Sequence, residues 1–324
     1  MLSLSILDLA PVSEGATPVA ALQNARELAQ LAERLGYKRY WVAEHHNMVG
    51  IASAATSVVI GFIAANTKTI RVGAGGIMLP NHSPLVIAEQ FGTLESLYPG
   101  RIDLGLGRAP GTDRRTMMAL RVDPAASEQF PQDVVELQAL LGPLQEGQMI
   151  QAVPGTNTNV PLWILGSSLF GAQLAGLLGL PYAFASHFAP DQLMQALEMY
   201  RATFKPSKQL QRPYAMAGVN VVAAETDEEA AHLFTSLQQR FADMARGVRG
   251  LLKPPIADIE AYWSGHEKIQ AQRMLACSFA GSPKALGLQL REFIAQTGVN
   301  ELMVATAVYD HKARLKSYEL LAEV

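Results

Sequence analysis

A histidine stands where a short apolar run ends, and its position suits proton transfer. His45 follows Tyr40–Ala43, which has the character of a buried strand. A single imidazole, with an ordinary pKa of about 6.5, can exchange a proton near neutral pH without a partner at any fixed spacing. His82 and His187 also follow apolar runs, so a mononuclear metal site is an alternative. In an extended chain His46 points away from His45, and it is interpreted as a packed or capping residue.

A cation and a serine-containing turn indicate a site for a phosphate group. Arg108 follows another apolar run, and a guanidinium can hold a phosphate through two parallel hydrogen bonds. The turn before the helical run at 168–178 offers backbone N–H groups and hydroxyls that bind anions, and it consists of Gly166, Ser167 and Ser168. A salt bridge from Arg108 and an ordinary helix cap are the structural alternatives. Together these residues predict a phosphorylated ligand between the strands predicted at 101–106 and 162–165, the fourth and fifth of the chain.

Glycines mark two further strand ends. Gly75 and Gly76 follow Ile70–Ala74, and backbone without Cβ atoms can lie flat against a ligand. Gly107 follows the next apolar run and directly precedes the arginine. The glycines around it imitate a dinucleotide-binding fingerprint, but their spacing is one residue too long and Pro110 interrupts them, so that interpretation is disfavoured.

The elements that must position these residues repeat one unit, an apolar run followed by a helical one. Eight strands are predicted, at 4–9, 40–43, 70–74, 101–106, 162–165, 182–185, 214–223 and 301–305. Helices are predicted at 18–35, 53–66, 83–97, 126–141, 168–178, 190–204, 227–245, 282–295 and 310–323. Strands that are apolar throughout, each followed by a helix, are typical of a parallel sheet covered by helices. Eight such units predict a closed (β/α)8 barrel, a TIM barrel, with an open doubly wound sheet as the alternative.

One segment exceeds any ordinary connection. Residues 247–281 contain Trp263, Gly265 and His266 and lie between two predicted helices. They are predicted to be an insertion after the seventh strand that forms a lid or a wall. No linker divides the chain, so residues 1–324 are expected to form a single domain.

The composition narrows the classes of function. The 324 residues are 49% hydrophobic and 17% charged, which is typical of a globular protein and excludes a fibrous or disordered chain. A formal net charge of -3 without a run of Lys or Arg argues against nucleic acid and anionic membranes as partners. Cys277 is the only cysteine, which excludes an internal disulfide and a thiolate metal cluster. Neither an export signal nor a membrane span is evident, and a cytoplasmic location is expected.

Three motifs together resemble those of the bacterial luciferase-like flavin monooxygenases. They are WVAEHH at 41–46, VGAGGIMLP at 72–80 and GRIDLGLGR at 100–108, and their order and spacing match the family as well. The resemblance covers essentially the whole chain. It implies a TIM-type barrel that binds FMN, with the flavin ring over a non-prolyl cis peptide between Gly75 and Gly76.

The resemblance also implies roles for the site residues. Arg108 and the turn at 166–168 match the family's FMN phosphate contacts, and His45 matches its catalytic histidine. Reduced FMN would act as a co-substrate with O₂ and form a C4a-(hydro)peroxyflavin, which inserts one oxygen atom into a small organic substrate. A separate NAD(P)H:flavin reductase is an implied partner. Gly107 stands where bacterial luciferase has a reactive cysteine, which argues against light emission but not against oxygenation.

Three functions remain open on the sequence. They are an FMN-dependent monooxygenase, a deazaflavin-dependent oxidoreductase of the same fold, and a non-catalytic flavin-binding protein, against which His45 argues. An apolar substrate pocket is indicated by Phe188, Trp263 and the pair Met117–Met118. No cluster of arginines suited to a sulfonate is evident in the sequence.

One helix predicts a second subunit. The run at 53–66 is apolar on nearly all sides, with Ala54, Ala55, Val58, Val59, Ile60, Phe62, Ile63 and Ala64. Such a helix needs cover on both sides, from the barrel and from a second copy of the chain as in the family's dimers. Burial under a loop of the same chain is the alternative, and a homodimer is expected.

Overall fold

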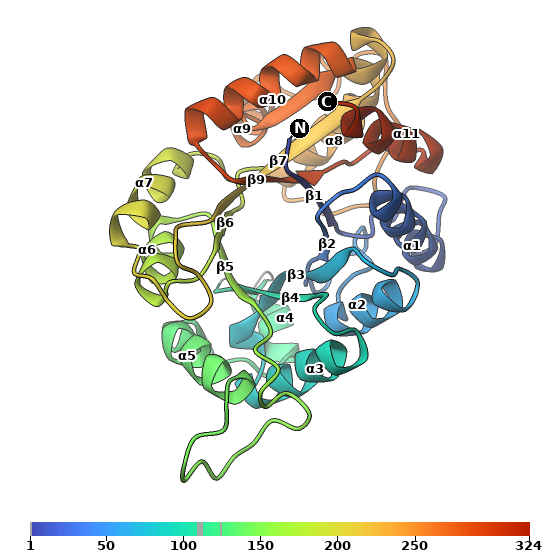
Figure 1. Cartoon of the computed structure of the whole chain (residues 1–324). Coiled ribbons are helices and arrows are strands. Elements are labelled where there is room, and N and C mark those ends of the chain that lie inside the picture. The colour runs from blue at the N-terminus through green and yellow to red at the C-terminus, as the bar shows by residue number, and fades with distance from the viewer. Residues whose placement is uncertain (1, 109–112, 124) are drawn as a thin grey trace.

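The fold is a closed barrel of parallel strands surrounded by helices (Figure 1). The computed structural model describes residues 2–108, 113–123 and 125–324. Within them eight strands form the barrel in the order β6-β5-β4-β3-β2-β1-β9-β7, and pairing of β6 with β7 closes it. These strands are β1 Leu4–Asp8, β2 Arg39–Val42, β3 Arg71–Met78, β4 Ile102–Gly107, β5 Leu162–Gly166, β6 Tyr182–Phe184, β7 Ala215–Ala223 and β9 Glu301–Ala305. The predicted TIM barrel is confirmed.

Helices follow the strands and cover the outside of the barrel (Figure 1). The longer ones are α1 Pro18–Arg34, α2 Thr56–Ala65, α3 Pro84–Leu97, α5 Phe130–Leu141, α6 Leu169–Leu178, α7 Leu193–Thr203, α8 Asp227–Ala245, α10 Pro283–Thr297 and α11 His311–Ala322. Short helices are η1 Leu79–Asn81, α4 Arg114–Ala119 and η2 Ala126–Glu128. No helix among the described residues is both long and apolar enough to cross a lipid bilayer.

Several predicted boundaries differ from the structure: the helix predicted at 126–141 begins at Phe130, and the one predicted at 190–204 spans Leu193–Thr203. Two further boundaries are wrong for reasons that local contacts show. Helix α2 begins at Thr56 rather than at Ser53, because the Ser53 hydroxyl donates to the carbonyl of Ala43 (2.6 Å) and does not cap the helix. Strand β3 does not stop at residue 74 but continues through the two glycines to Met78. Its register against β4 shifts between Gly75 and Ile77, so the glycines lie inside the strand.

The segment at 247–281 contains more structure than the prediction gave it. It includes α9 (Gly265–Met274) and a ninth strand, β8 (Ser278–Gly281), which pairs in parallel with the second half of β7. The four residues of β8 are only partly apolar, which is why a pattern of buried strands misses them. The aromatic side chain of Trp263 is buried in a small core against α8, so much of the insertion forms a wall on that helix.

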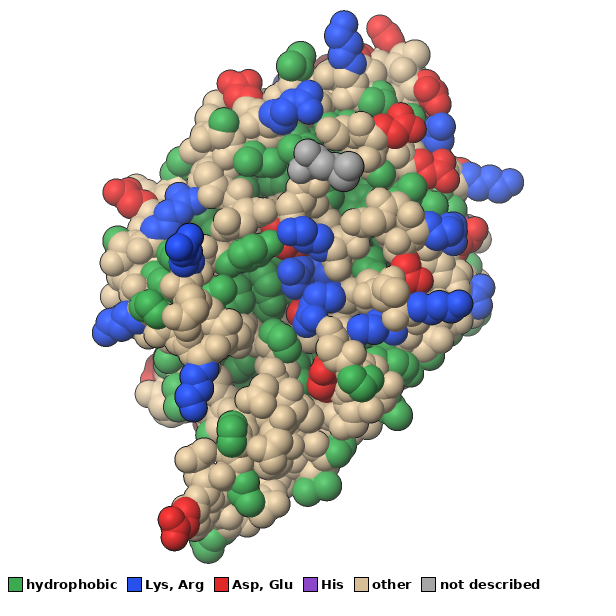
Figure 2. Space-filling model, in the orientation of Figure 1, with side chains coloured by type: hydrophobic (Ala, Val, Ile, Leu, Met, Phe, Trp, Pro, Cys, Tyr) green, Lys and Arg blue, Asp and Glu red, His purple; other side chains and the backbone are tan. Residues whose placement is uncertain are grey.

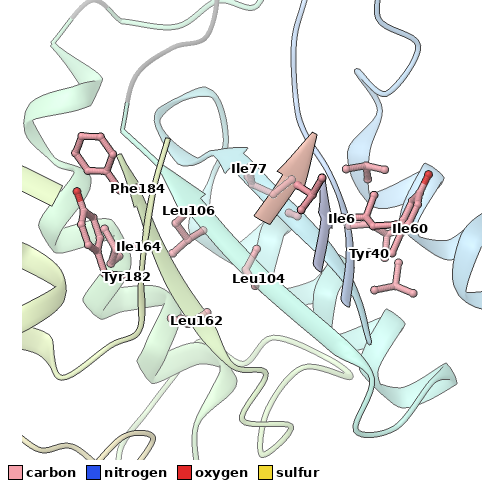
Figure 3. Packing of buried hydrophobic residues seen from close by; sticks show 14 of the residues in the cluster. Ile6, Tyr40, Ile60, Ile77, Leu104, Leu106, Leu162, Ile164, Tyr182 and Phe184 are labelled. Carbon is pink, nitrogen blue, oxygen red and sulfur yellow. The ribbon is translucent and has the colours of Figure 1, made fainter. Parts of the chain in front are cut away.

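Alternation along the strands divides the core into two layers. Ile6 and Tyr40 belong to the layer between strands and helices, part of which Figure 3 shows. Their neighbours Leu7 and Trp41 belong to a smaller cluster of buried side chains. Because successive side chains of a strand point to opposite faces, this second set fills the barrel interior.

Charges close the end of the barrel at which the strands begin. Arg39 donates to Asp103 (2.7 Å) and Glu301 (2.8 Å), and Arg71 also donates to Asp103 (2.6 Å). Figure 2 shows Lys and Arg side chains gathered near the centre of one face, with acidic atoms between them. These ion pairs lie where β2, β3, β4 and β9 begin, away from the end at which the strands finish.

Candidate active site

A cavity of about 520 Å³ lies where the barrel strands end, which is the end that carries the active site in TIM-barrel enzymes. The sequence-predicted site residues all line it, namely His45, Gly75, Gly76, Gly107, Arg108, Gly166, Ser167 and Ser168. Most of the remaining lining is apolar, and no Asp or Glu among the described residues contributes to it. The cavity therefore has positive charge without a balancing carboxylate.

Bare backbone forms part of the cavity wall. The peptide bond between Gly75 and Gly76 is cis, as the family resemblance implies. A Cβ atom on Gly75 would lie 2.9 Å from Leu7 Cδ1 and 3.0 Å from Trp41 Cε3, and one on Gly76 would lie 2.7 Å from the carbonyl oxygen of Gly105. Neither position accommodates a side chain, so a flat ligand can approach the main chain closely.

One side of the cavity is suited to an anion. The guanidinium carbon of Arg108 lies 4.2 Å from the ring centroid of Phe170, in the first turn of α6. The structure gives this arginine no carboxylate partner within the described residues. At the start of the same helix the Ser168 side chain makes no capping hydrogen bond, which leaves the N–H groups of the first turn available.

Two neutral histidines share the cavity. His45 and His187 both line it, and the buried Nδ1 atom of each has no hydrogen-bond partner among the described residues. Burial lowers the pKa of each ring to about 4, and the positive charge of Arg240 on α8 contributes to both shifts. At pH 7 both rings are therefore proton acceptors. This corrects the expectation that His45 has an ordinary pKa.

Strand β7 holds the loop that carries His187. Asn220 donates from Nδ2 to the main-chain carbonyl of His187 (2.6 Å), and the Ser186 hydroxyl donates to the carbonyl of Gly218 (2.6 Å). A Cβ atom on Gly218 would lie 2.3 Å from His187 Nδ1. The missing side chain at this glycine makes room for the imidazole.

The second histidine of the WVAEHH motif, His46, contacts Glu44 and does not line the cavity. His46 Nε2 lies 2.8 Å from Glu44 Oε1, and His82 Nε2 lies 2.9 Å from Glu44 Oε2. Burial raises the pKa of Glu44, but hydrogen bonds from His82, Asn81 and the Met78 N–H outweigh this and hold the pKa below its ordinary value. Among the described residues, no group of three or more His, Cys, Asp or Glu side chains is arranged to hold a metal ion.

Comparison with known proteins agrees with the motifs. Residues 2–301 match the family described as luciferase-like monooxygenase. A luciferase-like monooxygenase of Escherichia coli (strain K12) is 53% identical over 324 residues, covering 100% of this chain and 97% of that protein. The N-acetyl-S-alkylcysteine monooxygenase of Bacillus subtilis (strain 168) is 31% identical over 333 residues, covering 100% and 98%.

The chain belongs to the luciferase-like monooxygenase family.

Solved structures agree with the barrel of this protein. The crystal structure of apo-MsnO8 has a TM-score of 0.93 and 39% identity, covering 100% of this chain and 98% of that chain. Two structures at 16% identity share the fold alone. One is the oxygenating constituent of 3,6-diketocamphane monooxygenase from Pseudomonas putida in complex with FMN (TM-score 0.72, 99% and 97% covered). The other is an F420-dependent secondary alcohol dehydrogenase with an F420-acetone adduct (TM-score 0.69, 99% and 98% covered).

The apolar lining of the cavity differs from the sequence-based expectation. Phe188 lines the cavity, whereas Trp263 and the pair Met117–Met118 do not, and the side chain of Met118 is 72% exposed. Arg240 also lines the cavity, although the sequence motifs do not point to it. A signal for it exists, because it lies on α8 next to the apolar stripe of Leu237 and Phe241, where a charge is out of place.

The two cavity histidines, which are partly buried, predict how the stability of this protein depends on pH. In the unfolded chain they take up protons near pH 6.5, but in the folded chain only near pH 4. The unfolded state therefore binds more protons between these values, and the free energy of unfolding falls as the pH is lowered through this window. We expect a loss on the order of 1 kcal/mol per histidine between pH 7 and pH 5.

Urea denaturation across this pH range measures the effect. The variant His187→Gln should show a shallower dependence of unfolding free energy on pH than the parent, whereas the exposed His232→Gln should match the parent. Equal slopes for parent and His187→Gln would contradict the burial argument for His187.

Proposed function

We propose that this protein is an FMN-dependent monooxygenase that uses reduced FMN and O₂ to oxygenate a small organic substrate. One observation carries the proposal: a single cavity contains both an anion site, made by an arginine and the start of a helix, and a stretch of backbone without side chains. Arg108 and the turn of Gly166, Ser167 and Ser168 suit a phosphate, and the Gly75–Gly76 peptide suits a flat ring. The FMN complex of the structurally similar Pseudomonas putida protein supports the choice of cofactor.

The residues present fit FMN in both charge and shape. Arg108 has no competing carboxylate in the cavity lining, so its guanidinium is available for two charge-assisted hydrogen bonds. Gly107, at the end of β4, also lines the cavity, and a Cβ atom there would lie 2.9 Å from Met78 Sδ. When bound, reduced FMN supplies the electrons that activate O₂, so that one oxygen atom enters the substrate and the other leaves as water.

The chain's own groups contribute proton transfer and the exclusion of water. His45 is neutral at pH 7 and can accept a proton from a reacting group that lies in the cavity. The apolar lining, which includes Leu7, Trp41 and Met303, keeps water away from the reacting atoms. A separate NAD(P)H:flavin reductase is the proposed source of reduced FMN.

Titration of the purified protein with FMN, riboflavin and F420 tests the proposal. We expect FMN to bind more tightly than riboflavin, because FMN offers a phosphate to Arg108 and riboflavin does not. Oxygen consumption is then followed with reduced FMN over a panel of aldehydes, ketones and carboxylic acids. Binding of F420 in preference to FMN would overturn the cofactor assignment and favour a deazaflavin-dependent oxidoreductase.

A homodimer through the outer face of α2 is also proposed. Val59, Ile60 and Ile63 are buried on the barrel side, whereas Val58 is 71% exposed, so none of the described loops covers it. Val58→Asp should therefore shift the protein from dimer to monomer, because a carboxylate would be desolvated in an apolar interface. Sedimentation velocity measures the change. Val19→Asp, on an exposed valine of α1, is the control, and a parent that is monomeric at all concentrations would refute the dimer.

A further inference from the structure

We infer that Arg240 forms a second anion site in the cavity, for the carboxylate of a substrate whose remaining part is apolar. The inference rests on the proposed function, because it assigns the substrate of the same cavity. The phosphate site described above does not use Arg240, which comes from α8 rather than from a strand end.

Arg240, which is partly buried, differs from the two buried arginines Arg39 and Arg314 in having no partner in the described part of the chain. Arg39 is bonded to Asp103 and Glu301, and Arg314 donates to Asp8 (2.7 Å). The structure gives Arg240 no hydrogen bond and no ion pair within the described residues, and burial lowers the pKa of its guanidinium. Arg240 is partly buried and lines the cavity. A partly desolvated cation without a counter-charge is costly, so the group that balances it is expected to come from a ligand.

An arginine at the C-terminal end of α8 shows a different arrangement, because it is paired with carboxylates. Arg246 donates to Glu267 (2.8 Å) and to Asp243 (3.3 Å), outside the cavity lining. No carboxylate of the described chain reaches the cavity from any side. Arg240 therefore has no partner among the described residues of the cavity, whereas the surface arginine at the C-cap of α8 is paired.

An anion bound to Arg240 would lie in the same cavity as His45 and His187. Its charge acts on both His45 and His187, which come from the ends of β2 and β6. Arg108, by contrast, is stacked on Phe170 of α6. Two cations from different elements thus provide one place for a cofactor phosphate and another for the substrate.

The apolar lining of the cavity defines the rest of the substrate. Phe188 and Met244 line the cavity and are each 40% exposed, and Met48 and Ile51 contribute further apolar surface. Covering these side chains favours an apolar body. A carboxylate matches the planar guanidinium with two parallel hydrogen bonds, so an aliphatic carboxylic acid is the class of ligand that satisfies both features.

Calorimetric titration of the FMN-loaded protein with octanoate, octanesulfonate and 1-octanol tests the inference. We expect octanoate to bind at least about tenfold more tightly than 1-octanol, since only the acid pairs with the guanidinium. Arg240→Gln should weaken octanoate by about tenfold or more and leave 1-octanol nearly unchanged. Arg240→Lys, which keeps the charge, should retain part of the affinity, and the exposed Arg249→Gln should behave as the parent.

Equal affinity of the parent for octanoate and 1-octanol would overturn the inference, as would an equal loss of both in Arg240→Gln. Tighter binding of octanesulfonate than of octanoate would overturn the choice of a carboxylate. The same titrations on FMN-free protein separate the two proposals. Octanoate binding that depends on Arg240 in a protein that fails to bind FMN would overturn the proposed function and leave the anion site standing.

Discussion

His45→Ala is expected to bind FMN nearly as well as the parent but to lose on the order of 10²-fold or more in coupled oxygenation. His45 lines the cavity, and its ring is neutral at pH 7 because burial lowers its pKa to about 4. Removing a proton acceptor at the reacting end affects chemistry more than binding. The measurement is the yield of oxygenated product and of hydrogen peroxide per reduced FMN oxidised, followed across a pH series.

The neighbouring histidine provides a matched control for this variant. His46 is bonded to Glu44 and does not line the cavity, so His46→Gln should keep most of the parent's product yield. The parent should lose yield as the pH falls towards 4, where the ring of His45 becomes charged. If His45→Ala keeps the parent's yield at every pH, His45 is a structural histidine.

Arg108→Ala is expected to weaken FMN binding by about 1.5–3 kcal/mol, the usual size of a charge-assisted hydrogen bond. This corresponds to a dissociation constant roughly 10- to 150-fold higher. The fold should be unaffected, because the guanidinium is exposed and its recorded contact is the ring of Phe170. Fluorescence titration with FMN measures the constant.

Riboflavin, which lacks the phosphate, isolates the contribution of the arginine. The parent should bind riboflavin more weakly than FMN, and Arg108→Ala should bind the two about equally. Arg212→Ala removes an exposed arginine just before β7, at the other end of the barrel, and should bind FMN as the parent does. An unchanged constant in Arg108→Ala would remove this residue from the phosphate site.

The barrel itself could be predicted from local patterns. Each barrel strand is a short apolar run bounded by turn residues, and the helices have capping residues such as Thr17, Thr226 and Asp310, whose side chains accept from the first turn. These signals lie within a few residues of each other, so the sequence displays them directly. Strand β8 was not predicted, because its four residues have no apolar pattern of their own and form a strand by pairing with β7.

The strand-end positions of His45, Arg108 and the glycines also follow from the sequence, because parallel strands in a barrel all finish at one end. What the sequence alone could not determine is the environment of these groups. The lowered pKa of His45 depends on burial and on the charge of Arg240, which belongs to a helix far along the chain. Closure of the barrel between β6 and β7 brings His187 and α8 to the same cavity. Burial and electrostatic coupling depend on distances in space, and only the tertiary structure decides those.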